Sequence, residues 1–204
     1  MLLPIHPENP QPRKIQQAVQ VLRDGGVIAY PTGTVFGFGA DVHNKKAVEK
    51  VYRIKNTSPK KHKPFSFLCA DLSEISRYAV VPNSAYRLMK RLVPGPYTFI
   101  LEATREVPRM SISNRKTVGI RVPEHPVARA ILQEFGSPII STSAQRPEDE
   151  WPLNDPLDIA EAFPLVDLVL DAGFGGIEPS TVLAFNDFGE FEILRQGAGI
   201  IEEL

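Results

Sequence analysis

Short apolar runs rich in β-forming residues alternate along this chain with segments whose apolar residues recur at helical spacing. This alternation favours a layered α/β structure, because amphipathic helices bury their apolar sides against a sheet. We expect strands at 27–30, 65–69, 97–103, 117–122, 138–140, 168–170, 181–185 and 191–194, and helices at 12–24, 44–54, 71–78, 84–92, 126–135 and 155–163. The last two strands resemble a hairpin. The prediction is one domain over residues 1–204, with a single twisted, open, mixed sheet and helices packed on it.

The composition is ordinary for a globular protein, with 43% hydrophobic and 23% charged residues in 204. No apolar run approaches the roughly 20 residues of a membrane span, and the first residues have neither a basic start nor a long apolar stretch. We therefore expect a cytoplasmic protein without membrane association. One cysteine excludes an internal disulfide framework, and the four scattered histidines have no metal-ligand spacing. Cys69 ends an apolar run and is expected in the core.

The net charge of −1 hides a division within the chain. Residues 1–146 carry a balance of +12 and residues 147–204 a balance of −13. Two ranges, 41–63 and 86–121, each hold eight cations and two acids. These ranges could form one field that attracts phosphates, or two solvated faces folded against the acidic remainder.

The stretch from Gly25 to Pro64 indicates an anion site. A buried strand at 27–30 ends at small and hydroxyl residues, Thr32, Gly33 and Thr34, after which two further glycines would let the backbone approach a ligand. A helix capped by Asn44 follows. It ends in a lysine-rich segment broken by turn residues, whose lysines are Lys55, Lys60, Lys61 and Lys63.

The standard catalytic motifs do not occur. Residues 33–39 lack the Lys-Ser/Thr ending of a P-loop and the spacing of a dinucleotide fingerprint, and the chain has no G-x-S-x-G elbow. We therefore expect no residue with a covalent catalytic role. Arg121 stands out, since it lies between Ile120 and Val122 in an apolar strand. Either a bidentate anion or a buried ion pair, with Glu124 or another acid, would explain a guanidinium there.

Seven strings in order resemble the motifs of one family: YPTGTVFGFGAD, VYRIK, PGPYTFIL, TVGIRVPEHP, STSAQ, PSTV and ILRQGAG. They resemble the YrdC/YciO family, the threonylcarbamoyl-adenylate synthase family, over about residues 12–199. The wording around Asp71–Glu74 and Tyr86–Lys90 is closer to the YciO branch.

The resemblance implies an open α/β sheet with a concave, basic face that binds ATP and threonine. In the family's synthases threonine is carbamylated with bicarbonate and then adenylated, which releases pyrophosphate, and a partner transfers the product to tRNA. By position, threonine would be held by Thr32, Arg121, Thr142 and Ser180. ATP would be held by Lys55, Thr117, Ser143 and Arg195. Magnesium is expected with ATP, held mainly by phosphate oxygens and not by the protein.

The chain departs from the synthase pattern at four places. It has Lys55-Asn56-Thr57 for Lys-x-Arg, Gln145 for the asparagine of Ser-Ala-Asn, Leu68 for a histidine, and Arg146-Pro147-Glu148 for a small Ser-Gly. Each lost phosphate contact could cost about 1–3 kcal/mol. An alternative hypothesis is therefore a non-catalytic protein that binds double-stranded RNA or tRNA on the same face. Its candidate residues are Lys55, Lys60, Lys61 and Lys63.

Overall fold

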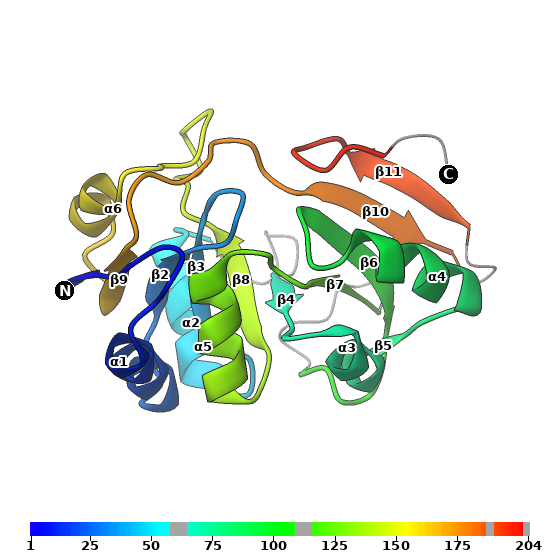
Figure 1. The fold of residues 1–204 in the computed structure, drawn as a ribbon, viewed down its shortest axis with the longest axis horizontal. Coiled ribbons are helices and arrows are strands. Elements are labelled where there is room, and N and C mark those ends of the chain that lie inside the picture. The colour runs from blue at the N-terminus through cyan, green and yellow to red at the C-terminus, as the bar shows by residue number, and fades with distance from the viewer. Residues whose placement is uncertain (58–64, 109–115, 187–189, 202–204) are drawn as a thin grey trace.

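The computed structural model describes residues 1–57, 65–108, 116–186 and 190–201 (Figure 1). Within these ranges the strands are β1 (Leu2–Pro4), β2 (Ile28–Pro31), β3 (Phe36–Asp41), β4 (Ser66–Leu68), β5 (Ala79–Val80), β6 (Tyr97–Ala103), β7 (Thr117–Arg121), β8 (Ile139–Ser143), β9 (Leu168–Asp171), β10 (Thr181–Phe185) and β11 (Phe191–Arg195). The helices are α1 (Pro12–Arg23), α2 (Lys45–Ile54), α3 (Leu72–Tyr78), α4 (Asn83–Leu92), α5 (Pro126–Phe135) and α6 (Pro156–Ala162).

Most helices begin and end where the local sequence predicts. The side chains of Asn44, Asp71 and Asp155 accept hydrogen bonds from backbone N–H groups in the first turns of α2, α3 and α6. Gly136 ends α5 in the left-handed region, with φ of 73°. The helix expected at 84–92 begins one residue earlier, at Asn83, and its N-cap residue Pro82 makes no side-chain cap bond.

All strands join one sheet in the order β1-β9-β2-β3-β8-β4-β7-β6-β10-β11, with β5 pairing β6 to the side. Parallel pairs, such as β4–β7 and β6–β10, occur beside antiparallel pairs, such as β3–β8 and β6–β7. The predicted mixed, open sheet is therefore confirmed. None of the helices in the described part of the chain has the length and apolar character needed to cross a bilayer.

The two faces of the sheet are covered differently. One face, called the α1/α5 face here, carries Ile28, Tyr30 and Ile139, which pack with α1 and α5. Figure 1 shows these two helices side by side in front of β2, β3 and β8. The opposite face packs against α2, α3, α4 and α6 in the larger core. Among the described residues the α1/α5 core takes no side chain from β6, β7 or β10, so these strands can present polar groups on that face.

Two strand boundaries differ from the prediction and affect the site. The stretch Phe36–Asp41, interpreted as a ligand-approaching loop, is the strand β3, which forms a hairpin with β2. Strand β8 does not stop at Ile140 but runs on to Ser143. The short strands β1 and β5 were also not expected. They have only three and two residues, too few to show a periodic pattern.

Candidate functional site

Arg121, at the end of β7, is the centre of the candidate site. Its Nη1 donates to Thr34 Oγ1 at 2.6 Å and to Thr32 Oγ1 at 3.3 Å, and its Nη2 donates to the Thr32 carbonyl at 2.9 Å. Its Nε donates to the Gly95 carbonyl at 3.2 Å. Every one of these acceptors is neutral. The guanidinium is therefore held in a fixed orientation while its charge stays uncompensated by them.

The charge of Arg121 is buried, since the residue is only 5% exposed. Burial lowers the pKa of Arg121 to about 10, with Tyr30 and Glu124 opposing the shift and Arg195 adding to it. The guanidinium remains protonated at neutral pH. Among the described residues no carboxylate lies within ion-pair distance of it, so the alternative of a buried ion pair with Glu124 is wrong. A buried cation without an acid is a group that an anionic ligand would stabilise.

Ser180 brings a second cation to the same region. Its hydroxyl lies 2.8 Å from Thr98 Oγ1, and its carbonyl accepts from Arg195 Nη2 at 2.7 Å and Arg195 Nε at 3.1 Å. Arg195 is near enough to Arg121 to lower its pKa. Arg121 and Ser180, which the resemblance assigns to threonine, and Arg195, which it assigns to ATP, thus lie in one region of the structure.

Lys55, at the end of α2, is more buried than a lysine side chain that is freely available to bind phosphate. It is 6% exposed, and its Nζ donates to the Ser143 carbonyl at 3.0 Å and to the Gln145 carbonyl. Burial lowers the pKa of Lys55 to about 8, while Asp149 raises it. These two bonds tie the turn after β8 to α2. Among the described residues the third N–H of this ammonium has no acceptor, so it is available to a ligand. The ammonium is too buried to bind the backbone of a duplex RNA lying on the surface.

The extension of β8 decides which hydroxyls face the site. Ser143 is paired with Gly37 and Ser141 with Gly39, whereas Thr142 is paired with the core residue Phe38. Paired residues point to the same face and neighbours alternate, so Ser141 and Ser143 lie on the α1/α5 face and Thr142 on the opposite one. The geometry therefore does not bring the Thr142 side chain to Arg121, contrary to our expectation.

Ser141 is a site residue that sequence reasoning missed. Its hydroxyl accepts a hydrogen bond from Tyr30 at 3.1 Å. A Cβ at Gly37 would lie 3.0 Å from Ser141 Oγ and 3.1 Å from Thr32 Cγ2, so only glycine lets these two residues approach each other. The spacing Ser141-Thr142-Ser143 was a usable signal, because in an extended strand its first and third residues share a face.

The remaining predicted residues lie farther out or outside the description. Thr117 begins β7 on the same face as Arg121, roughly 13 Å away along the strand. Leu68 is paired with Arg121 and buried, so an apolar side chain stands where the family's synthases have a histidine. The lysines predicted for RNA lie outside the described residues, namely Lys60, Lys61 and Lys63.

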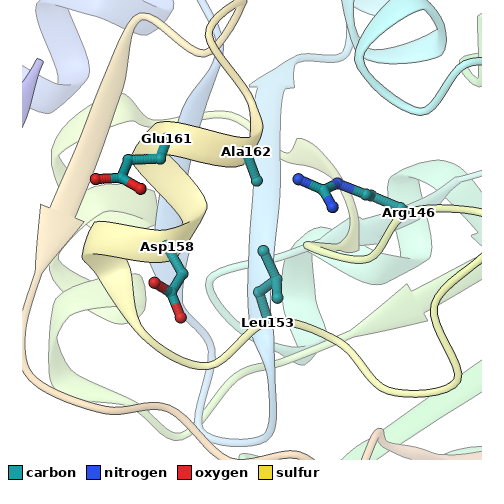
Figure 2. Close-up of a pocket in the computed structure, with 5 residues that line it drawn as sticks. All are labelled: Arg146, Leu153, Asp158, Glu161 and Ala162. Carbon is teal, nitrogen blue, oxygen red and sulfur yellow. The ribbon is translucent and has the colours of Figure 1, made fainter.

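A hollow of about 440 Å³ lies elsewhere, between α6 and the segment that follows β8 (Figure 2). Its lining residues are Arg146, Leu153, Asp158, Glu161 and Ala162. Arg146 lies over the ring of Phe163 at 6.0 Å, and Phe163 packs on Phe38 in the larger core. This hollow is therefore on the face opposite Arg121, and it contains none of the predicted site residues.

The side chain of Gln145, another departure from the synthase pattern, is hydrogen-bonded to backbone carbonyls of its own loop. Its Nε2 donates to the Asp149 carbonyl at 2.9 Å and to the Glu150 carbonyl at 3.3 Å. The substituted residues after β8 thus form a turn that folds back on itself. In the described part of the chain, no three acidic, histidine or cysteine side chains gather to hold a metal ion. Magnesium held mainly by ATP phosphates stays a prediction.

Comparisons with known proteins agree with the motif order. The family model Sua5/YciO/YrdC, described as "Telomere recombination", matches residues 20–197. The YciO protein of Escherichia coli (strain K12) is 44% identical over 200 residues, covering 97% of this chain and 96% of that protein. The threonylcarbamoyl-AMP synthase of Halorhodospira halophila is 32% identical over 177 residues, covering 86% of this chain and 91% of that protein.

Solved structures show the same fold. The crystal structure of E. coli YciO matches with a TM-score of 0.91 and 42% identity, covering 98% of this chain and 97% of that one. The crystal structure of P. abyssi Sua5 complexed with L-threonine matches with a TM-score of 0.88 and 27% identity, covering 97% of this chain and 57% of that one. By its sequence, its fold and the matched family model, this chain belongs to the Sua5/YciO/YrdC family.

Proposed function

We propose that this protein binds threonine and ATP on the α1/α5 face and forms threonylcarbamoyl-AMP from threonine, bicarbonate and ATP. One observation carries the proposal: the buried guanidinium of Arg121 is fixed by four neutral acceptors and lacks an acidic partner among the described residues. An amino-acid carboxylate could accept the one N–H of Nη2 that these four bonds leave and would supply the missing negative charge.

Hydroxyl groups around Arg121 suit the rest of a threonine molecule. Thr32, Ser141 and Ser180 lie on three different strands or strand ends near the guanidinium, and each is held by a hydrogen bond. Their oxygens can accept from an ammonium or donate to a hydroxyl. The relatives named threonylcarbamoyl-AMP synthase and the Sua5 structure with L-threonine support this assignment.

The reaction needs positioning more than a protein nucleophile. The threonine amine would form an N–C bond to bicarbonate with loss of water. A carbamate oxygen would then form a bond to the α-phosphorus of ATP while the bond from that phosphorus to the β-phosphate bridging oxygen breaks. The products are threonylcarbamoyl-AMP and pyrophosphate. Holding the reactants together and offsetting the charge on the phosphates can supply most of the rate.

The cations of the site have separate parts in this scheme. Arg195 has its Nη1 without a partner among the described residues, so it can reach a phosphate while Nη2 and Nε hold Ser180. Within the described part of the chain, Lys55 has one N–H left for a phosphate oxygen after its two carbonyl bonds. Magnesium supplied with ATP would neutralise the leaving pyrophosphate. The product would pass to a partner that modifies tRNA, as the family resemblance implies.

The test is pyrophosphate release by the purified protein with ATP, Mg²⁺, threonine and bicarbonate. We expect release that requires all four components, and threonylcarbamoyl-AMP in the mixture by mass spectrometry. Blanks that omit threonine or bicarbonate measure background ATP hydrolysis. Release no higher than these blanks, across a range of pH and ATP concentration, would show that the chain is not such a synthase.

A further inference from the structure

The sheet has two outer edges, and they are protected differently. Strand β1 at one edge has three residues and ends at Pro4, which has no N–H to offer another strand. Strand β11 at the other edge has five residues, all of them exposed. Figure 1 shows β11 outermost in the sheet, beyond β10. Only β10 pairs with it among the described strands, so its outer row of backbone groups faces away from the sheet.

The β11 edge, defined as residues 191–195, is apolar for a surface strand. Phe191 is 37% exposed, Ile193 48% and Leu194 55%. Neither lysine nor proline, the usual guards of an edge strand, occurs in it. Leu194 is the extra residue of a bulge, because Val182 pairs with Arg195 while Leu183 pairs with Ile193. An exposed edge with this composition is typical of a strand that pairs with another chain.

We propose that the β11 edge binds the β11 edge of a second copy of this chain, as an antiparallel pair with two-fold symmetry. A two-fold axis at Ile193 would place Ile193 against Ile193 of the second copy, an apolar cross-strand pair. Phe191 lies on the same face as Ile193, since they pair with Phe185 and Leu183, so its ring would lie diagonal to Ile193 of the second copy and within its reach.

The charges on β11 favour this register, and the net charge of the chain allows two copies to approach each other. An axis one residue earlier would oppose two Glu192 carboxylates, which is unfavourable. With the axis at Ile193, each Glu192 lies opposite Leu194 and one strand position from Arg195 of the second copy. The net charge of −1 leaves little long-range repulsion between copies. A five-residue strand pair buries less than the roughly 1,200 Å² of a stable interface, so the dimer should depend on concentration.

Cross-linking through a new cysteine tests the register. In Ile193→Cys the two new side chains would meet at the axis, with Cβ atoms about 4.5–5.5 Å apart, near the separation that a disulfide needs. The native Cys69 is buried and does not compete. Leu157→Cys, at a 56% exposed residue on α6, is the matched control. Under mild oxidation at about 100 µM we expect a disulfide dimer from Ile193→Cys and little from Leu157→Cys. Equal cross-linking of both variants would overturn the proposal.

Sedimentation of the unlabelled protein measures the association itself. Wild type should shift from monomer to dimer as concentration rises, and Ile193→Lys should raise the dimer Kd about tenfold or more, because it places like charges on the axis. Leu157→Lys should leave the Kd unchanged. A wild type that stays monomeric at 500 µM overturns the proposal, including the case where β11 binds a strand of another protein. A dimer that Ile193→Lys does not weaken overturns it as well.

Discussion

Replacing Arg121 with methionine separates a ligand-binding guanidinium from a structural one. Methionine has similar length but neither charge nor donors. The change removes four hydrogen bonds, worth about 1 kcal/mol each, and also removes the several kcal/mol cost of burying a charge without an acid. These effects oppose each other. We expect the free energy of unfolding to change by less than about 2 kcal/mol, which is a few degrees in Tm for a chain of this size.

The same variant, Arg121→Met, should lose most of its affinity for threonine. The one guanidinium N–H that these four bonds leave, on Nη2, can make a single charge-assisted hydrogen bond to the threonine carboxylate, worth about 1.5–3 kcal/mol, or roughly 10- to 150-fold in Kd. Thermal melting with and without threonine measures both effects in one assay, and pyrophosphate release measures the consequence for turnover. Arg77→Met is the control, since Arg77 has a 65% exposed side chain and only a 3.9 Å contact to Glu106. If Arg121→Met instead lost the 3–5 kcal/mol typical of a broken buried ion pair, or kept the stabilisation by threonine, this reasoning would be wrong.

Three further predictions concern the other side chains of the site. Ser141→Ala should weaken threonine binding about tenfold, the worth of one hydrogen bond, whereas Thr142→Val should leave it unchanged; calorimetric titration with threonine compares the two. The pKa of Lys55 is lowered from 10.5 to about 8 in the folded protein, so between these pH values the unfolded chain binds a proton at Lys55 that the folded chain does not. The contribution of Lys55 to the free energy of unfolding should therefore rise with pH in this range. Chemical unfolding experiments should show this rise in the wild type and not in Lys55→Met. ATP binding should weaken over the same range as the ammonium loses its charge. Thr57→Arg restores the guanidinium of Lys-x-Arg and should lower the KM for ATP about tenfold without changing the KM for threonine; equal changes in both would contradict it.

The sheet and the helices could be predicted because their signals are local. The helices expected at 44–54, 71–78, 126–135 and 155–163 begin or end at one capping side chain or one backbone angle, at Asn44, Asp71, Gly136 and Asp155, and the structure has these helices within a residue or two of those ranges. Strand β3 could not be predicted in this way. Its glycines match a loop signal, but they are there because neighbouring strands bring Tyr30 and Ser141 close to its backbone. That requirement comes from strand order, which periodicity does not reveal.

The types of residue in the site were predicted better than the face of the sheet to which each side chain points. Arg121 was correctly separated from ordinary surface arginines, because a lone cation in an apolar strand needs a reason. Gly95, a partner of Arg121, and Thr98, the partner of Ser180, carried no signal, since the first contributes a backbone carbonyl and the second lies inside a strand whose sequence is mostly apolar. Thr142 was assigned from the family resemblance, and the expected strand end at residue 140 gave residues 141–143 no face. Once β8 runs to Ser143, the alternation of a strand places Thr142 on the face opposite Ser141 and Ser143.

On the proposed assignment, two departures from the synthase pattern, Thr57 and Gln145, lie at the nucleotide end of the site, and a third, Leu68, lies beside Arg121. At the threonine end Thr32 and Arg121 are both present, and the guanidinium is already oriented by its neutral acceptors. At the other end Thr57 replaces a guanidinium, and the Gln145 amide is used by the carbonyls of its own loop and not held ready for a ligand. Threonine affinity and ATP affinity should therefore differ in how far they fall below those of synthases with the full pattern. A protein that binds threonine well and ATP weakly is what this division of the site implies, and it is why restoring the lost guanidinium should act on ATP alone.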